Sequence, residues 1–337
     1  MNEPLAWILA TGARGPLGLS SAQIAMCVRA AKMEPTASRF LDRRGEAIGL
    51  CHTSALPETL WGHDRLLRLA APALCEAWPL DATTPTPLVL ALPEAGRADD
   101  DPRFDHGFVR ELAARSRRPI DLERSRTIRA GNAGFALAIE AATALLALPG
   151  GPATVMVGGV DGHVHPEVLA DLDRALRLHA PGTEDGFIPS EGAAFVLLSR
   201  RPPARGSGPA LAAIRRVLTG REATVGTDEP AIAAAMTAIF HALGQGDPVR
   251  WVLSDLNGES HRLREWTLVE ARAQGGGAWV HDELVGELGD VGSATGALLT
   301  AIACEYFAAG CAPATSVVIA LASDGAERGA LQIEAIS

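Results

Sequence analysis

The chain has 337 residues, of which 47% are hydrophobic, 4% aromatic and 21% charged, and its formal net charge at pH 7 is −10. This composition excludes a disordered chain, and the length suits two domains or one large domain of two layered halves. The acidic charge argues against nucleic acid as the main partner, because binding to a phosphate backbone requires surplus cations. Lys32 is the only lysine, which argues against Schiff-base chemistry.

Strand-like and helix-like segments follow the same order in the two halves of the chain. Residues 6–10 and 211–218 predict an opening strand in each half. Two later segments, residues 133–148 and 292–310, are apolar on nearly every side and rich in Ala and Gly. They are short for a membrane span, so we interpret them as buried core helices and expect no membrane partner.

Each predicted core helix is followed by a buried strand, a turn and a second strand. These strands are expected at residues 153–157, 193–198, 316–322 and 330–336. Strands alternating with helices predict α/β layers whose sheets are covered on both faces. Residues 200–209 are rich in Pro, Gly and Arg and are typical of a linker. We therefore expect an N-terminal half over residues 1–204 and a C-terminal half over residues 205–337.

The cysteines favour a cytoplasmic location. They are odd in number, widely spread and without a C-x-x-C pair, at Cys27, Cys51, Cys75, Cys304 and Cys311. This spacing predicts neither a disulfide framework nor a metal site. No basic segment precedes the apolar residues 5–10, so we do not expect a signal peptide there.

Five segments in order resemble those of the β-ketoacyl-acyl-carrier-protein synthases of the thiolase superfamily: residues 6–18, 132–139, 157–161, 186–193 and 289–296. The resemblance implies an α/β, thiolase-like fold with two duplicated βαβαββ halves, each with a mixed five-stranded sheet. The halves would pack in five α-β-α-β-α layers around two central helices. The resemblance also implies a homodimer, or a heterodimer with an active ketosynthase, formed through the strand near residues 155–159.

The resemblance places three substitutions at the catalytic positions. The family uses a cysteine at the start of the first core helix and two histidines. This chain has Asn132 at the cysteine position and Asp290 at the second histidine position, while the first histidine falls on Ser254 or Asp255, depending on a one-residue gap. An amide cannot be acylated as a thiolate is, and a carboxylate repels a developing oxyanion. We therefore expect a catalytically degenerate protein that requires no cofactor.

Each of these positions also has a plainer interpretation. Asn132 would be an amide donor to a bound carbonyl, or a helix N-cap, which we favour. Asp255 and Asp290 would form a carboxylate pair for acid–base chemistry, or solvated residues, with an ordinary Asn-Gly turn at residues 257–258. His163 and His165 have metal-ligand spacing but no readable third ligand, so we expect surface-loop histidines.

Seven arginines lie between Arg110 and Arg129. They are either a docking patch for an acidic partner, such as an acyl carrier protein or a secreted effector, or a solvated helical face. The leading functional hypothesis is a binding, partner or accessory protein, for example in type VI secretion. The alternative is a divergent acyl-thioester decarboxylase, hydrolase or acyltransferase that uses Asp255, Glu259 or Asp290.

Overall fold

The computed structural model describes residues 3–31, 34–80, 82–180, 183–203, 210–225, 230–245, 248–273 and 279–336. Lys32 lies outside the described residues, as do residues 204–209 of the expected linker. The boundary after residue 204 therefore stays a prediction.

Eight elements build the first half: β1 (Ala6–Arg14), α2 (Gly62–Ala77), β4 (Thr86–Ala91), α4 (Phe108–Ser116), β5 (Ile120–Ile128), α5 (Gly134–Ala147), β6 (Thr154–Gly162) and β7 (Glu191–Ser199). Eight build the second: β8 (Ala212–Arg221), α7 (Ala234–Gly244), β9 (Trp251–Ser254), α8 (Ser260–Ala273), β10 (Val280–Asp282), α10 (Thr295–Ala308), β11 (Ser316–Ala322) and β12 (Glu327–Ala335). The remaining elements are α1 (Ser21–Arg29), β2 (Thr36–Leu41), β3 (Ala47–Leu50), α3 (Arg103–His106), α6 (Pro166–Arg174), α9 (Val285–Leu288) and the 3-10 turn η1 (Gly292–Ala294).

The two halves repeat one sheet topology. The order is β5-β4-β6-β7-β1 in the first half and β10-β9-β11-β12-β8 in the second. In each half the first three strands of that order are parallel and the last two antiparallel to their neighbours. The half-sheets join into one sheet through a short pairing of β1 with β8, residues 6–8 against 212–214. The predicted duplication is confirmed.

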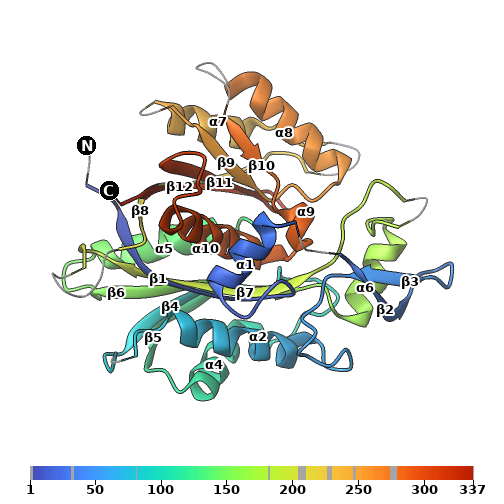
Figure 1. Ribbon diagram of the computed structural model, residues 1–337, viewed down its shortest axis with the longest axis horizontal. Coiled ribbons are helices and arrows are strands. Elements are labelled where there is room, and N and C mark those ends of the chain that lie inside the picture. Colours follow the sequence, from blue (N-terminus) through green and yellow to red (C-terminus); the bar gives the residue numbers. More distant parts are fainter. Residues whose placement is uncertain are drawn as a thin grey trace.

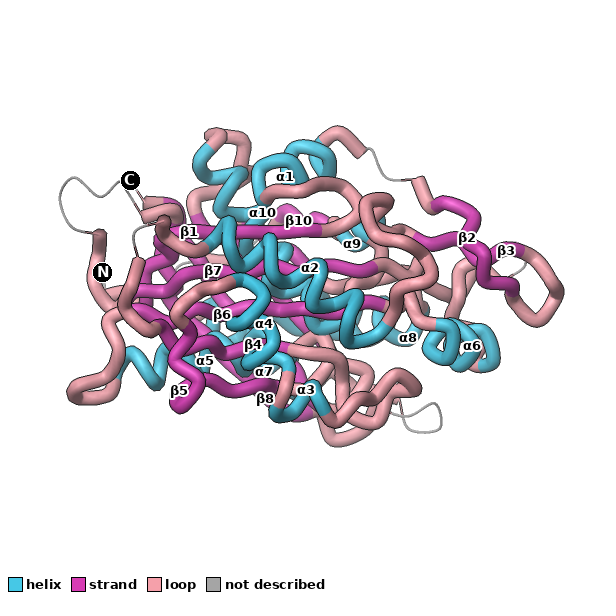
Figure 2. The backbone as a smooth tube through the Cα atoms, turned by 90° about the horizontal axis from the view of Figure 1, so that it is seen from below, coloured by secondary structure: helices cyan, strands magenta, loops and turns pink. Residues whose placement is uncertain are grey.

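The elements form five layers (Figure 1). Helices α7 and α8 cover the outside of one half-sheet, α5 and α10 lie between the half-sheets, and α2 and α4 cover the outside of the other. Figure 2, seen from below, shows α2 running across the strands of the first half-sheet. The predicted α-β-α-β-α arrangement around two central helices is therefore confirmed.

Each half contains one more strand–helix unit than the predicted βαβαββ, so its order is βαβαβαββ. Sequence reasoning missed the buried strand β4, the separate pair β2 and β3, and the strands β5 and β10, which lie at the two ends of the large sheet. Edge strands are buried on fewer sides, so they need no apolar run. The sequence of β5, IDLERSRTI, is half-exposed, and β10 has only three residues.

The central helices pack closely because their neighbours are small. Most residues of α10 are buried, and half of those of α5. A Cβ atom on Gly159 of β6 would lie 2.6 Å from the carbonyl oxygen of Ser293, so only glycine lets β6 approach η1 this closely. In the described ranges no helix is long and apolar enough to cross a membrane.

Two expectations about surfaces are wrong. Residues 155–159 lie inside β6, which is paired with β4 on one side and β7 on the other. That strand has no open edge and cannot pair with a second subunit. The segment from Arg110 to Arg129 is not one helical face, because α4 ends at Ser116 and β5 follows. The arginines therefore divide between the end of a helix and an edge strand.

Candidate functional site

Loops of both halves meet in a cavity of about 360 Å³ at the carboxyl ends of the parallel strands. Its walls include residues 94–98 after β4, Asn132 before α5, His163 after β6, Asp290 before η1 and Asp324 after β11. We call it the strand-end cavity. It contains two of the three predicted site residues, Asn132 and Asp290.

Asn132 is a pocket residue and not a helix cap. Helix α5 has Ala133 as its N-cap and no side-chain capping bond, so the favoured N-cap interpretation is wrong. The Ala133 N–H is instead satisfied by the Ser323 hydroxyl at 3.0 Å. Asn132 is 6% exposed, and its amide nitrogen has no hydrogen-bond partner in the described part of the chain. The side chain therefore keeps a free donor at the cavity wall.

Asp290 is held by its backbone and by its carboxylate. Its N–H and carbonyl bond with Ile188 and Ser190 just before β7. Oδ1 accepts a bond from Gly292 N (2.8 Å), and Oδ2 one from Asn257 Nδ2 (2.7 Å). Burial alone would raise the pKa of Asp290, but His163, Arg262 and Asn257 together hold it well below its usual range. Asp290 is therefore a fixed, ionised carboxylate.

His163 is the site residue that sequence reasoning missed, and its expected place in a surface loop is wrong. It is 8% exposed, and its Nε2 lies 3.6 Å from Asp290 Oδ1, which is beyond hydrogen-bond range. Neither ring nitrogen has a hydrogen-bond partner among the described residues. Its position after a buried strand was the available signal, because functional side chains gather at such strand ends. His165, by contrast, caps α6 by accepting from Glu167 N.

Asp255 lies outside the strand-end cavity. It lines a separate cavity of about 20 Å³, where Oδ2 accepts from Ala322 N at 2.8 Å and lies 3.5 Å from Arg262. Burial raises the pKa of Asp255 to about 6, although Arg262 acts in the opposite direction. The charge of Asp290 adds to the rise. The two carboxylates thus influence each other, but they do not face one shared space.

The other candidate at the first histidine position, Ser254, contacts a different element. Its hydroxyl lies 2.8 Å from His281 Nε2 on β10. Asn257 reaches Asp290 instead, and its Oδ1 accepts from Glu259 N in a local turn. The expected Asn-Gly turn is confirmed in shape by the positive φ of Gly258. Through its bond to Asp290, the Asn257 side chain also links the loop after β9 to the cavity.

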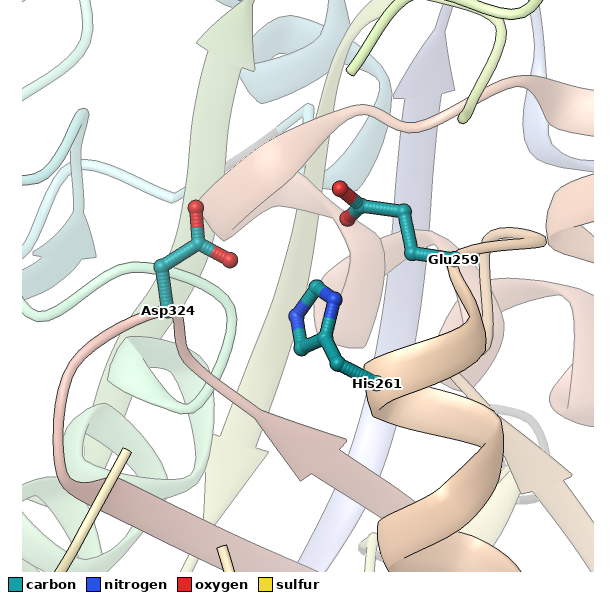
Figure 3. A group of neighbouring side chains, drawn as sticks. All are labelled: Glu259, His261 and Asp324. Atoms are coloured by element: carbon teal, nitrogen blue, oxygen red, sulfur yellow. The ribbon is translucent and has the colours of Figure 1, made fainter. Parts of the chain in front are cut away.

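Glu259, His261 and Asp324 converge beside the start of α8 (Figure 3). Their ligand atoms lie within 4.8 Å of one another. Both carboxylates are already paired, since Arg177 bonds Glu259 at 2.6 Å and Asp324 at 2.6 Å, while Arg262 bonds Asp324 at 2.7 Å. A divalent cation would have to compete with these guanidinium groups, so the cluster fits an ion-pair network better than a metal site.

The described residues that line the strand-end cavity include no Cys, Ser, Thr, Tyr or Lys. All five cysteines are free thiols. Burial raises the pKa of Cys51 to about 12 and raises that of Cys304 as well, which makes both poor nucleophiles. The cavity therefore offers an amide, an imidazole and carboxylates, but no thiol or hydroxyl to acylate.

No protein-family model matches the chain, and no curated protein matches it by sequence. Solved structures match it over nearly the whole length. The ketosynthase from module 6 of the bacillaene synthase from Bacillus subtilis 168 is 13% identical with a TM-score of 0.75, covering 98% of this chain and 72% of that one.

Two of the matching structures are multi-subunit ketosynthases. The ishigamide ketosynthase/chain length factor is 17% identical with a TM-score of 0.69, covering 98% and 99% of the two chains. A type II polyketide synthase acyl-carrier protein in complex with its ketosynthase, AntDE:AntF, is 16% identical with a TM-score of 0.68 and full coverage of both chains. The chain therefore has the thiolase-like fold of the ketosynthases.

Proposed function

We propose that this protein is a non-catalytic ketosynthase-like protein whose strand-end cavity binds a ligand without forming a covalent intermediate. The observation that carries the proposal is the side-chain content of the cavity. Asn132 stands at the start of α5, and no thiol or hydroxyl lines the cavity among the described residues. Asp290 opposes any developing oxyanion, because its carboxylate is fixed and ionised.

In this proposal the fold serves as a partner or accessory subunit, with a ketosynthase, a carrier protein or a secretion effector as its partner. The likeness to a ketosynthase/chain length factor and to a ketosynthase with its carrier protein supports a partner of this kind. Exposed arginines at the end of α4 and on β5, such as Arg115 and Arg124, supply positive charge for an acidic surface. The five free cysteines support a cytoplasmic location.

One observation favours an enzyme instead. His163 and Asp290 lie side by side and together form an imidazole–carboxylate pair of the kind that activates water. Asn132 would donate a hydrogen bond to a thioester carbonyl. This alternative is an acyl-thioester hydrolase. In this alternative His163 and Asp290 act in place of Glu259, because the Glu259 carboxylate is already paired with Arg177.

Incubation with acyl- and malonyl-thioesters decides between the two. We expect no covalent adduct by mass spectrometry, no CO₂ and no free acid above the uncatalysed rate. Free acid whose formation is lost in His163→Gln, but retained in His241→Gln, would establish the hydrolase. His241 is a suitable control because it contacts Arg272 on α8, away from the cavity.

A further inference from the structure

The strand-end cavity has an excess of negative charge. Among the described residues that line it, the carboxylates are Glu94, Asp171, Asp290 and Asp324, and the cations are Arg97, Arg177 and Arg262. The excess is larger than this comparison suggests, because each arginine is bound by further carboxylates behind the wall.

The guanidinium groups are committed to structural ion pairs. Arg97 binds Asp99 at 2.6 Å and Asp161 at 2.8 Å, so two carboxylates share one cation. Arg177 and Arg262 are held by the Glu259 and Asp324 network described above. None of the three is available to an anionic ligand without breaking a pair that is at least partly buried.

The helix N-termini at the cavity are also occupied. The N–H of Ala133, the N-cap of α5, donates to Ser323 Oγ, the N–H of Gly134 donates to the carbonyl of Gly131, and Gly292 N at the start of η1 donates to Asp290 Oδ1. The usual attraction of a helix N-terminus for anions is therefore reduced here. The guanidinium groups and these backbone donors are already engaged, so they leave the excess of carboxylates in place.

Glu94 is the carboxylate left without a partner, since no hydrogen bond or ion pair joins it to another described residue. It lies against the loop that carries Asn132, because a Cβ atom on Gly131 would be 3.1 Å from Glu94 Oε2. Burial, and then the charges of Asp324, Glu327 and Asp161, raise the pKa of Glu94, while Arg97 acts more weakly in the opposite direction. The surroundings of this carboxylate are thus negative.

A second observation, separate from the charge, concerns two side chains of the cavity wall, Asn132 and His163, whose nitrogens have no hydrogen-bond partner among the described residues. Asn132 is 6% exposed and His163 is 8% exposed, and both line the cavity with ring or amide nitrogens that lack partners. Buried polar groups are normally satisfied, so such groups in a cavity wall indicate a ligand with complementary acceptors. A ligand that pairs with the Glu94 carboxylate and accepts a hydrogen bond from Asn132 must carry both a positive charge and a hydrogen-bond acceptor.

We infer that the strand-end cavity binds a small ligand with a protonated amine, which pairs with Glu94, and a carbonyl group that accepts from Asn132. This inference rests on the proposed non-covalent binding function and names its ligand class. An amine with a carbonyl satisfies Glu94 and Asn132 together, whereas a free malonyl-type carboxylate places a further anion among the existing ones.

A charge series of nearly equal size tests the inference. The probes are 4-aminobutanamide, butanamide and succinamate, which carry charges of about +1, 0 and −1 at pH 7. We expect ligand-observed NMR titration of the full chain to show the cation binding about tenfold more tightly than the neutral amide, with no binding of the anion. In Glu94→Gln the preference for the cation should disappear, while Glu123→Gln on the exposed β5 edge should retain it.

Several results overturn the inference. These are equal affinity for all three probes, tighter binding of succinamate, no binding of any probe, or an unchanged preference in Glu94→Gln. Circular dichroism of Glu94→Gln establishes that a loss of preference is not unfolding. The outcome is separate from the thioester assay, since a protein without turnover can still fail to bind the amine.

Discussion

At the scale of single residues, the structure and the sequence prediction differ over which side chains line the same cavity. Asn132 and Asp290 meet in one cavity as the resemblance implied, while Asp255 lies in another and His163 joins them. The sequence could not reveal this, because the burial of His163 depends on α6 and on Phe187, whose ring centroid lies 5.3 Å from the imidazole. Only tertiary packing decides which of two histidines in H-x-H is enclosed.

Asp255 makes a residue-scale prediction about pH. Its folded-state pKa of about 6 is above the ordinary value of 3.8. The protonated carboxyl therefore contributes stability that is fully present below pH 3.8 and is lost as the pH rises through 6. Asp255→Asn removes this loss, so between pH 4 and 8 the wild type should lose about 2 kcal/mol of unfolding free energy relative to the variant. Urea denaturation at several pH values measures the difference, and parallel pH profiles would contradict the assignment.

At the scale of elements, most strands buried on both faces were predicted, with β4 as the exception, while the edge strands β5 and β10 were not. The expected strand at residues 316–322 matches β11 residue for residue, because an uninterrupted apolar run bounded by turns leaves little choice. Strand β5 carries Asp121, Glu123, Arg124 and Arg126 within nine residues, which resembles a polar helix or loop. It becomes a strand because β4 offers it a hydrogen-bonding edge.

The joint between β6 and α10 makes an element-scale prediction. Asp161 at the end of β6 accepts bonds from Ser293 N (2.9 Å) and Ser293 Oγ (2.8 Å), and so ties β6 to η1. Gly292 has φ +55, and a Cβ atom there would lie 2.2 Å from Asp161 Oδ2. Gly292→Ala should therefore destabilise the fold by about 2–4 kcal/mol through backbone strain and loss of these bonds.

Gly244→Ala is the matched control for this joint. Gly244 ends helix α7, and a Cβ atom there meets nothing within 4 Å. Thermal unfolding should show an unchanged or slightly raised midpoint for Gly244→Ala, since alanine has the higher helix propensity. Similar midpoints for the two variants would mean that the Asp161–Ser293 joint does not constrain the central helices.

At the scale of the whole molecule, the continuous sheet has two ends, β5 and β10. Strand β10 has three residues, so a second subunit that extends the sheet would have to pair with β5. This edge is irregular, because Asp121 and Arg126 of β5 face Pro87 and Val89 of β4, and the residues between them bulge. A dimer formed there would rely on charge more than on a long regular ladder.

Strand β5 carries charges of both signs at its open edge, with Asp121 and Glu123 beside Arg124 and Arg126. These charges sum to zero, so two copies can meet along β5 without net repulsion and with opposite charges close together. A homodimer through β5 should therefore dissociate between about 0.05 and 0.5 M salt, where screening of exposed charges becomes strong. Sedimentation velocity measures this change.

Charge reversal separates the β5 edge from a general salt effect. Arg124→Glu should weaken the dimer about tenfold or more, because β5 would then carry three acidic residues and one basic residue, and two copies would repel along the shared edge. Arg174→Glu on α6 is the matched control, since Arg174 is also exposed and pairs with an aspartate three residues earlier, as Arg124 does. If both variants dimerise as the wild type does, or if the wild type is a monomer at low salt, β5 is not a self-association edge, and its arginines remain available for an acidic partner.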